Sequence, residues 1–441
     1  MAGQQKDVPS AVQPLLPVEY GAGRVRLAPG VRAGDWVFLS GLMATSHSGA
    51  LQPALTDWPL PLHGEPRHKI EAGIILERAR SILDAGGSSF ANVLRTDQFY
   101  PDWRAVDHFQ GQRRRLLGSY IPPSTSILQE ELLVPGAGID VSMVAVASDP
   151  SLRIERFFPA ELEVPAGAGF TPVVRCRDFV FVAGFMAAHQ PGDLGGIAPE
   201  AKVPPGHLWK GTGIKLETRY LIERKLLPAL TAAGASQSSV LKAQVYLADI
   251  KDLPAFNEVW LQYFAASPPA TVIVPTSRPG FAIEDANIEV NVIALREDGA
   301  ANKTNIEVAS FVGYPGQPAA VRAGDLLFVS GLMAIGRNGP APGISVDLAT
   351  RYFGASIERQ MEHILDVAEE ICAAAGTSLC NVVCARQFHT RLEEFYPAYQ
   401  AWDRRLPSQP LPLSAVRIPG PLSAPDCTVL LDICAYIPTK E

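Results

Sequence analysis

The chain has 441 residues and a formal net charge of −7 at pH 7, with 47% hydrophobic and 19% charged residues. This composition is typical of a well-buried globular protein of about three domains and excludes a disordered chain. Basic residues are scattered, and the run Arg113 to Arg115 has no aromatic stacking platform beside it. We therefore expect no nucleic-acid partner.

Membrane, metal and cofactor signals are absent from the sequence. No stretch of about 18 apolar residues occurs and the first residues lack an apolar signal segment, so neither a membrane span nor secretion is expected. The six cysteines all lie after residue 150, which favours reduced thiols in a cytoplasmic protein over a disulfide framework. Cys380 and Cys384 have no partners at zinc-finger spacing, and no nucleotide or flavin motif occurs, so no metal and no cofactor are predicted.

One stretch occurs three times. It reads VRAGDWVFLSGLMA at 31–44, VRCRDFVFVAGFMA at 174–187 and VRAGDLLFVSGLMA at 321–334. Its aspartates are Asp35, Asp178 and Asp325, separated by 178 − 35 = 143 and 325 − 178 = 147 residues, a period of whole domains. Each copy predicts a hairpin turn and a buried strand, with glycine where the backbone bends or approaches another group closely.

The same elements follow each hairpin. An amphipathic helix is predicted at 68–85, 214–233 and 355–375, then a strand at 93–100, 240–247 and 382–389. A second helix is predicted at 105–117, 253–264 and 393–405. A proline corner and two strands close the unit, the last strand at 139–146, 288–295 and 429–436. Each repeat thus reads β-β-α-β-α-β-β, an α+β unit with a mixed sheet and two helices on one face. The expected domains are 1–150, 151–300 and 301–441, with linkers near 148–165 and 296–312.

The pattern resembles the RidA/YjgF family of enamine/imine deaminases, which has a chorismate-mutase-like fold. The resemblance rests on AGD-hydrophobic-SG at 33–41 and 323–331, AAG at 232–234 and 374–376, VLKAQVYLADIKDLPAFNEVW at 240–260, PPAT at 268–271 and IEVNVIAL at 288–295. Family members are usually homotrimers with sites in the clefts between neighbouring domains. The resemblance implies that this chain forms a pseudo-trimer by itself, as a monomer or homodimer acting on a small molecule.

The resemblance also implies a missing arginine. The family's carboxylate-binding arginine in the corner PxRT corresponds to Ser124, Ala270 and Ser414, so none of the three repeats keeps it. Arg417 lies three residues past Ser414, and on a regular strand an odd offset points to the opposite face. It replaces the arginine only if a bulge intervenes.

The remaining candidate residues are carboxylate, hydroxyl and amide groups. The family's water-holding glutamate corresponds to Ser142, Asn291 and Asp432, and a family asparagine on the second helix is kept as Asn257. We expect Asp432 and Ser414 to be catalytic, because a carboxylate beside a hydroxyl can orient water or shuttle a proton. The alternative is a polar pair in a non-catalytic cleft. The residues expected to bind substrate are Ser124, Ser126, Ser142, Asn291, Asn257, Arg417, Arg386, Asp97 and Gln244.

The middle strand of each repeat carries one of three matched polar residues, Asp97, Gln244 and Arg386. Arranged around a pseudo-threefold axis, they would either recognise one asymmetric ligand or form an interdomain salt bridge and hydrogen bond. The sequence leaves both interpretations open.

The leading functional hypothesis is a hydrolase or deaminase acting on a C–N bond of an imine, an enamine or a small nitrogenous ring. A second is a non-catalytic protein that binds or senses a small metabolite, supported by the loss of the arginine from every repeat. A third is a ring-opening amidohydrolase resembling cyanuric acid hydrolase and barbiturase, whose threefold serine–lysine set cannot be assembled because no lysine lies between Lys303 and Lys440.

Overall fold

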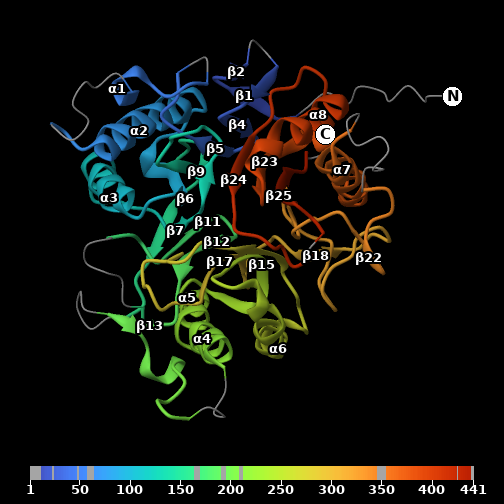
Figure 1. Cartoon of the computed structure of the whole chain (residues 1–441). Coiled ribbons are helices and arrows are strands. Elements are labelled where there is room, and N and C mark those ends of the chain that lie inside the picture. Colours follow the sequence, from blue (N-terminus) through green and yellow to red (C-terminus); the bar gives the residue numbers. More distant parts are fainter. Residues whose placement is uncertain are drawn as a thin grey trace.

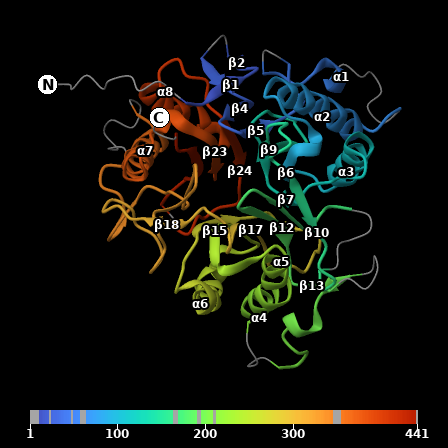
Figure 2. The same cartoon turned by 180° about the vertical axis from the view of Figure 1, so that it is seen from behind.

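A computed structural model describes residues 11–21, 24–46, 49–56, 64–162, 169–189, 195–207, 212–344, 354–424 and 426–438. This part of the chain contains three large mixed sheets, each with its helices on one side (Figure 1). The helices lie on the outside of the molecule and the sheets turn toward its centre, as the opposite view also shows (Figure 2).

The first sheet has the strand order β1-β4-β5-β9-β6-β7. Its strands are β1 (Gln13–Leu15), β4 (Gly30–Ala33), β5 (Trp36–Leu42), β6 (Val93–Tyr100), β7 (Ser124–Leu128) and β9 (Asp140–Val146). Its two long helices are α2 (Arg67–Ala85) and α3 (Arg104–Leu117), and the short helix α1 (Pro53–Thr56) precedes them. β6 and β7 are parallel, whereas the other pairs are antiparallel.

The second sheet repeats this order as β10-β11-β12-β17-β15-β16. Its strands are β10 (Ile154–Phe157), β11 (Val173–Cys176), β12 (Phe179–Phe185), β15 (Ala235–Leu247), β16 (Ala270–Pro275) and β17 (Ile288–Arg296). Its helices are α4 (Gly213–Leu221), α5 (Leu227–Ala232) and α6 (Leu253–Phe264).

The third sheet repeats it once more as β18-β19-β20-β25-β23-β24-β8. Its strands are β18 (Lys303–Ile306), β19 (Ala320–Ala323), β20 (Leu326–Val329), β23 (Val382–His389), β24 (Leu413–Arg417), β25 (Val429–Tyr436) and β8 (Glu131–Leu132). Its helices are α7 (Ser356–Ala375) and α8 (Phe395–Arg405). Short hairpins join β2 (Val18–Tyr20) to β3 (Val25–Leu27), β13 (Ala188–His189) to β14 (Gly196–Ile197), and β21 (Ile335–Gly336) to β22 (Gly339–Pro340).

The predicted order of elements and the mixed sheet with helices on one face are confirmed. Two details differ. The segments expected to be linkers contain β10 and β18, which add an edge strand to the second and third sheets. The helix expected at 214–233 is interrupted by a π-helical turn at Ile222–Leu226, just before Pro228, because proline lacks the N–H that a regular α-helix needs there.

The first long helix of each repeat is tied to its sheet by one equivalent side chain. Glu71 Oε1 accepts a hydrogen bond from the Gly138 amide at 2.7 Å, and Glu217 Oε2 accepts one from Asn287 at 2.9 Å. In the third repeat, Gln360 Oε1 accepts one from the Thr428 amide at 2.9 Å. The three acceptors are buried, so each satisfies an amide that would otherwise be costly to bury.

The second-half glycine of each repeated stretch, which is Gly41, Gly184 or Gly331, lies where one repeat meets another. A Cβ built on each glycine would come within about 3.4 Å of a closing strand, the pairs being Gly41 with Ser414, Gly184 with Thr125, and Gly331 with Val272. These contacts join the first repeat to the third, the second to the first, and the third to the second, respectively. We call each contact a seam. The predicted need for glycine at a close approach is therefore confirmed.

Candidate functional site

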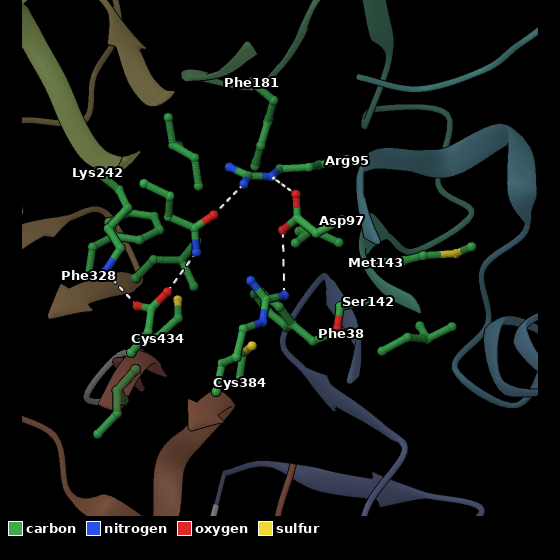
Figure 3. A pocket seen from close by; sticks show the side chains of 18 residues that line it. Phe38, Arg95, Asp97, Ser142, Met143, Phe181, Lys242, Phe328, Cys384 and Cys434 are labelled. Atoms are coloured by element: carbon green, nitrogen blue, oxygen red, sulfur yellow. Dashed lines mark hydrogen bonds and ion pairs between the residues drawn. The ribbon is translucent and has the colours of Figure 1, made fainter. Parts of the chain in front are cut away.

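A cavity of about 70 Å³ lies where the three sheets face one another. Figure 3 shows side chains from all three repeats converging on it. Its apolar wall includes the matched residues Phe38, Phe181 and Phe328, one from each repeated stretch. Its polar wall consists of Arg95, Asp97, Ser142, Lys242, Gln244, Arg386 and Asp432, together with the thiols Cys384 and Cys434. We call this cavity the axial pocket.

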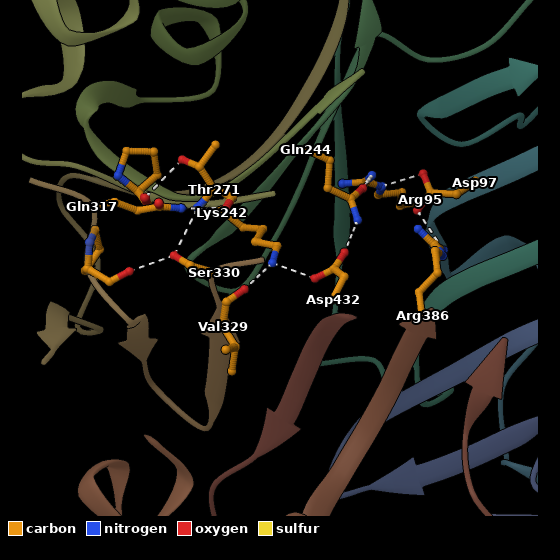
Figure 4. Close-up of polar contacts among 12 residues, drawn as sticks. Arg95, Asp97, Lys242, Gln244, Thr271, Gln317, Val329, Ser330, Arg386 and Asp432 are labelled. Carbon is orange, nitrogen blue, oxygen red and sulfur yellow. Dashed lines mark hydrogen bonds and ion pairs between the residues drawn. The ribbon is translucent and has the colours of Figure 1, made fainter. Parts of the chain in front are cut away.

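One half of the polar wall is built around Asp432 on β25 (Figure 4). Lys242 Nζ donates a hydrogen bond to Asp432 Oδ1 at 2.6 Å and a second one to the carbonyl of Val329. Gln244 Nε2 donates to the other oxygen of Asp432, also at 2.6 Å. Both carboxylate oxygens are therefore occupied by partners from the second repeat.

The other half is built around Asp97 on β6. Arg95 Nε donates to Asp97 Oδ1 at 2.8 Å, and Arg95 Nη2 donates to Gln244 Oε1 at 2.5 Å. Arg386 Nη2 lies 3.5 Å from Asp97 Oδ2. The two halves thus form one continuous polar network, which runs through all three repeats and includes an ion pair between the first and the third.

Electrostatics keep Asp432 ionised. Burial alone would raise its pKa, but the charge of Lys242 and the hydrogen bond from it outweigh burial and hold the pKa below its usual range. An ionised carboxylate with both oxygens occupied is poorly placed to hold an attacking water. Its geometry is that of a buried, fully paired ion.

A cluster of three aromatic side chains lies beside Arg386. Phe99 lies beside Tyr246 and Phe388, with ring centroids 6.3 and 5.9 Å apart, and these three residues occupy matched positions on β6, β15 and β23. The Arg386 guanidinium carbon lies 5.1 Å from the centre of the Phe99 ring. The cation is thereby held against an apolar surface, away from bulk water.

Some of the residues expected to bind substrate do meet in this pocket. Asp97, Gln244 and Arg386 come together there, and Asp432 and Ser142 lie beside them. The sequence had left open whether the first three recognise a ligand or bridge the repeats. The bridge is present in the structure, and the pocket adjoins it.

Ser414 does not lie next to Asp432. Both residues pair with Arg386 on β23, one from β24 and the other from β25. They are therefore separated by two strand spacings, about 10 Å. Ser414 packs instead against Gly41, and within the described residues its hydroxyl has no hydrogen-bond partner. This geometry gives no direct contact between the two residues expected to be catalytic.

Ser124 and Ser126 face the helix layer. Both hydroxyls donate to Gln98 Oε1, at 3.1 and 2.6 Å, and Arg113 on α3 donates to Ser124 at 2.8 Å. The side chain that faces the second repeat is the intervening Thr125, which is the strand partner of Asp97. The expected placement of the two serines in a cleft therefore differs from the structure by one residue.

The other expected residues lie in three places. Asn291 donates from Nδ2 to Thr125 Oγ1 at 3.0 Å, across the seam between the first and second repeats. Arg417 forms ion pairs with Glu130 at 2.9 Å and Glu131 at 3.3 Å. Its strand pairs in regular register, so no bulge turns it toward the missing arginine's position. Asn257 is half-buried on α6.

Four charged residues of the interior were not singled out from the sequence. Arg95 and Lys242 stand two residues before Asp97 and Gln244, and Asp140 and Glu289 stand two residues before Ser142 and Asn291. Side chains two apart on a strand share a face. The alternation RTDQ, KAQ, IDVS and IEVN is the signal that could have identified them.

Glu289 lies at the seam between the first and second repeats. A Cβ built on Gly184 would be 2.1 Å from Glu289 Oε1 and 2.9 Å from Thr125 Oγ1, so the carboxyl and the hydroxyl flank the same point. Glu289 is 4% exposed. Burial, reinforced by the negative charge of Asp97, raises the pKa of Glu289 to about 8. A carboxyl group with a pKa of about 8 carries a proton at neutral pH. It can give up that proton readily, because its pKa is close to neutral pH.

Asp140 is the matching residue of the first repeat. It is 0% exposed, and neither of its oxygens has a hydrogen-bond partner among the described residues. Burial raises its pKa to about 7, against the opposing effect of Arg386. The third repeat has Leu430 at this position and therefore no carboxyl group.

Two further features concern the described residues only. No group of three or more His, Cys, Asp or Glu side chains there could hold a metal ion. None of the helices in this part of the chain is long and apolar enough to cross a membrane.

These strand orders and seams are accompanied by clear sequence relationships. The family model described as Endoribonuclease L-PSP matches residues 161–296. A RutC family protein of Pyrococcus abyssi is 35% identical over 143 residues, which are 32% of this chain and 98% of that protein. The chain therefore belongs to the RidA/YjgF family, to which the sequence motifs had pointed.

Two other comparisons differ in how much of the chain they cover. The 3-aminoacrylate deaminase RutC of Acinetobacter baylyi is 26% identical over 141 residues, which are 31% of this chain and 98% of that protein. A solved chorismatase structure aligns with 78% of this chain and 93% of its own, at 12% identity and a TM-score of 0.45.

Proposed function

We propose that this protein hydrolyses a C–N bond of a small imine or enamine at the seam between its first and second repeats, with Glu289 as the general acid. The observation that carries the proposal is the position of Glu289, a buried carboxyl group that faces the Thr125 hydroxyl across the seam. Family membership supports the reaction class, since a relative of similar length to one repeat bears the name 3-aminoacrylate deaminase.

The chemistry asks for one proton donor and one positioned water. The protonated Glu289 donates its proton to the imine nitrogen, which makes the carbon electrophilic. Water adds to that carbon, the C–N bond breaks, and the nitrogen leaves as ammonia while the carbon becomes a carbonyl group. The added water loses two protons in all. One returns to Glu289, and the other goes to the departing nitrogen, which together with the proton from Glu289 makes ammonia. Thr125 Oγ1, which accepts a hydrogen bond from Asn291, is the polar group that could orient the water.

The absence of the family's carboxylate-binding arginine limits which substrates the protein can bind. Ala270 and Ser414 occupy its position in two repeats, and Arg417 is paired with two glutamates. Without a guanidinium to bind a carboxylate in a bidentate manner, a 2-imino acid has no anchor. The proposed substrate is therefore a neutral imine, enamine or small ring compound.

The other two seams are less suited to the proposed reaction, because neither has an accessible carboxyl group that matches Glu289. Asp140, the matching carboxyl group of the first repeat, is 0% exposed. At the seam between the second and third repeats, Leu430 replaces the carboxyl group, and the Gly331 amide donates to the Thr271 carbonyl at 3.0 Å. The proposal therefore assigns the reaction to one seam rather than to three.

The architecture belongs to the same proposal. We place domain boundaries at 1–150, 151–300 and 301–441 and a pseudo-threefold axis through the axial pocket. The shared strand order of the three sheets supports this arrangement, as do the seams that run from each repeat to the next. Because the ring closes within one chain, the expected assembly is a monomer, with a homodimer as the alternative.

A non-catalytic binding protein is the competing candidate. The observation in its favour is the axial pocket, where Asp432 is fully paired and the nearby polar groups converge on a small cavity. In that case the seam residues would serve packing alone.

The test is ammonia release from neutral imines generated in place, compared with 2-imino acids and cyclic amides. Wild type is expected to release ammonia from the neutral imines. Glu289→Gln should lower kcat at least a hundredfold, whereas Asp140→Asn, the matched change in the first repeat, should retain the activity. Equal activity of wild type and Glu289→Gln would show that Glu289 is not the general acid. If wild type releases no ammonia from any compound of the panel, the non-catalytic binding protein is favoured.

A further inference from the structure

We propose that the axial pocket is a binding site for a small monovalent oxyanion, such as formate, acetate or bicarbonate. The site is separate from the seam that contains Glu289 and does not depend on the proposed reaction. It lies where the three repeats meet and takes side chains from each of them (Figure 3).

The first reason is an excess of positive charge. Three cations line the pocket, namely Arg95, Lys242 and Arg386, against the two carboxylates of Asp97 and Asp432. The difference, 3 − 2, is one positive charge among side chains that are 3% to 8% exposed. A buried charge without a counter-ion is costly, so an anion in this pocket would stabilise the fold as it binds.

The second reason is a guanidinium with unused donors. Arg386 has five N–H donors, and among the described residues it forms one ion pair, the 3.5 Å contact with Asp97. Among the described residues, its buried Nε has no hydrogen-bond partner. Its guanidinium carbon also lies 5.1 Å from the centre of the Phe99 ring. An oxyanion in the pocket would supply the missing acceptors, and a guanidinium can bind it through two parallel hydrogen bonds.

The third reason is size and shape. The cavity of about 70 Å³ has room for about five to seven water-sized groups, since one water needs about 10–15 Å³ on this measure. Formate, acetate and bicarbonate have three or four heavy atoms, whereas a sugar acid or a nucleotide is far too large. The rings of Phe38, Phe181 and Phe328 form the apolar side, which suits the hydrogen or methyl end of a carboxylate.

The groups that face Arg386 set the pH dependence. They are Asp97, Asp432, Asp140, Tyr246 and Cys384. Burial raises the pKa of Asp140 to about 7, so this carboxyl group is neutral in mild acid and adds a negative charge to those of Asp97 and Asp432 near Arg386 above pH 7. Anion binding is therefore expected to be tighter at pH 6 than at pH 8.5.

The test measures the melting temperature of the full chain as sodium formate or acetate is titrated at constant ionic strength. Gluconate, a carboxylate of the same charge that is too large for the pocket, is the matched control. A saturable rise with formate or acetate and none with gluconate is expected. A rise of the same size with all three anions would overturn the proposal, because it would show a general salt effect.

Two substitutions must act in opposite directions. Arg386→Gln should weaken formate binding at least tenfold, whereas Asp97→Asn, which raises the net charge of the pocket by one, should strengthen it. Arg417→Gln, outside the pocket, should leave the affinity unchanged, and so should Glu289→Gln, which separates this site from the proposed catalysis. Equal affinities for wild type, Arg386→Gln and Asp97→Asn would overturn the assignment.

A direct readout does not depend on any variant folding. Crystals of wild type grown with bromide should show an anomalous peak within hydrogen-bond distance of the Arg386 guanidinium. Water alone at that position, in crystals that bind bromide elsewhere, would contradict the proposal.

Discussion

Lys242 and Asp432 form a buried ion pair between the second and third repeats, with side chains 6% and 9% exposed. Removing one member leaves the other charge buried without its partner, which costs about 3–5 kcal/mol in comparable pairs. Asp432→Asn is therefore expected to lower the free energy of unfolding by about 3 kcal/mol in urea titrations.

A double-variant cycle supplies the control for this prediction. Lys242→Met combined with Asp432→Asn removes both charges, so the double variant should be more stable than the sum of the two single losses. Strict additivity would show that the pair contributes nothing through its charges.

Asp140 predicts a pH dependence of stability. Its pKa is about 7 in the fold and near 3.9 in an unfolded chain, so the folded state binds the extra proton between these values. The associated stability is fully present below about pH 4 and is lost as pH rises to about 7. Asparagine stays neutral throughout. Asp140→Asn should therefore melt several degrees above wild type at pH 8 and close to it at pH 4.5.

The measurement is the difference between the two melting temperatures at each pH. A difference that stays constant from pH 4.5 to pH 8 would mean that the carboxyl group does not titrate in this interval. Ser142→Ala, two residues along the same strand, is the control that changes packing without a titrating group.

At the scale of single elements, the repeated stretch and the helices respond to the same substitution in opposite ways. Gly184 lies in the stretch of the second repeat, and an added Cβ would lie 2.1 Å from Glu289 Oε1. Gly73 and Gly111 lie inside α2 and α3, where an added Cβ meets nothing within 4 Å. Gly184→Ala should destabilise the protein, whereas Gly73→Ala and Gly111→Ala should each stabilise it by about 0.5–1 kcal/mol.

Thermal melts of the three variants check this prediction. If Gly184→Ala melts at or above the temperature of wild type, the seam is looser than the structure shows. If Gly73→Ala and Gly111→Ala melt at a lower temperature than wild type, the added methyl groups do meet other atoms of the protein.

The elements themselves could be predicted from the sequence, because periodicity and glycine or proline boundaries repeat three times. β6 and β23 have the predicted bounds, and α2 and α7 differ from prediction by one residue. The edge strands β10 and β18 were missed, because they are short segments whose pairing depends on a sheet formed elsewhere. The π-helical turn was missed because Pro228 lies within an otherwise helical pattern.

Side-chain direction was the less predictable property. Aligning the proline corners matches Ser124 with Ala270, but the strand pairing matches Thr125 with Asp97 and Val272 with Gln244. A shift of one residue moves every side chain to the other face of the sheet. The serines were therefore assigned to the wrong face, although the strand that carries them was correctly predicted.

At the scale of the molecule, the axial network joins residues far apart in the chain. Hydrogen bonds link Arg95 to Gln244 and Lys242 to Asp432, which are 149 and 190 residues apart. The sequence identified Asp97, Gln244 and Arg386 as a matched set through the repeat, but it could not show which charges pair across the repeats. That pairing depends on how three sheets meet.

The ring of seams predicts a single particle of 47.4 kDa that unfolds cooperatively. Each repeat contacts both others, so no repeat can open without breaking two seams. Light scattering after size exclusion should give the monomer mass, with the homodimer as the alternative. A trimer of full chains would contradict closure of the ring within one chain.

We propose that Glu289 acts as a protonated acid, and the pH profile of kcat/KM for a neutral imine is the measurement that checks this role. With uncatalysed hydrolysis subtracted, kcat/KM should be level from pH 6 to 7 and fall about tenfold per pH unit above the Glu289 pKa of about 8. Glu289→Gln should lose this descending limb together with its activity. A profile that stays level to pH 9.5, or a limb that persists in Glu289→Gln, would contradict the account.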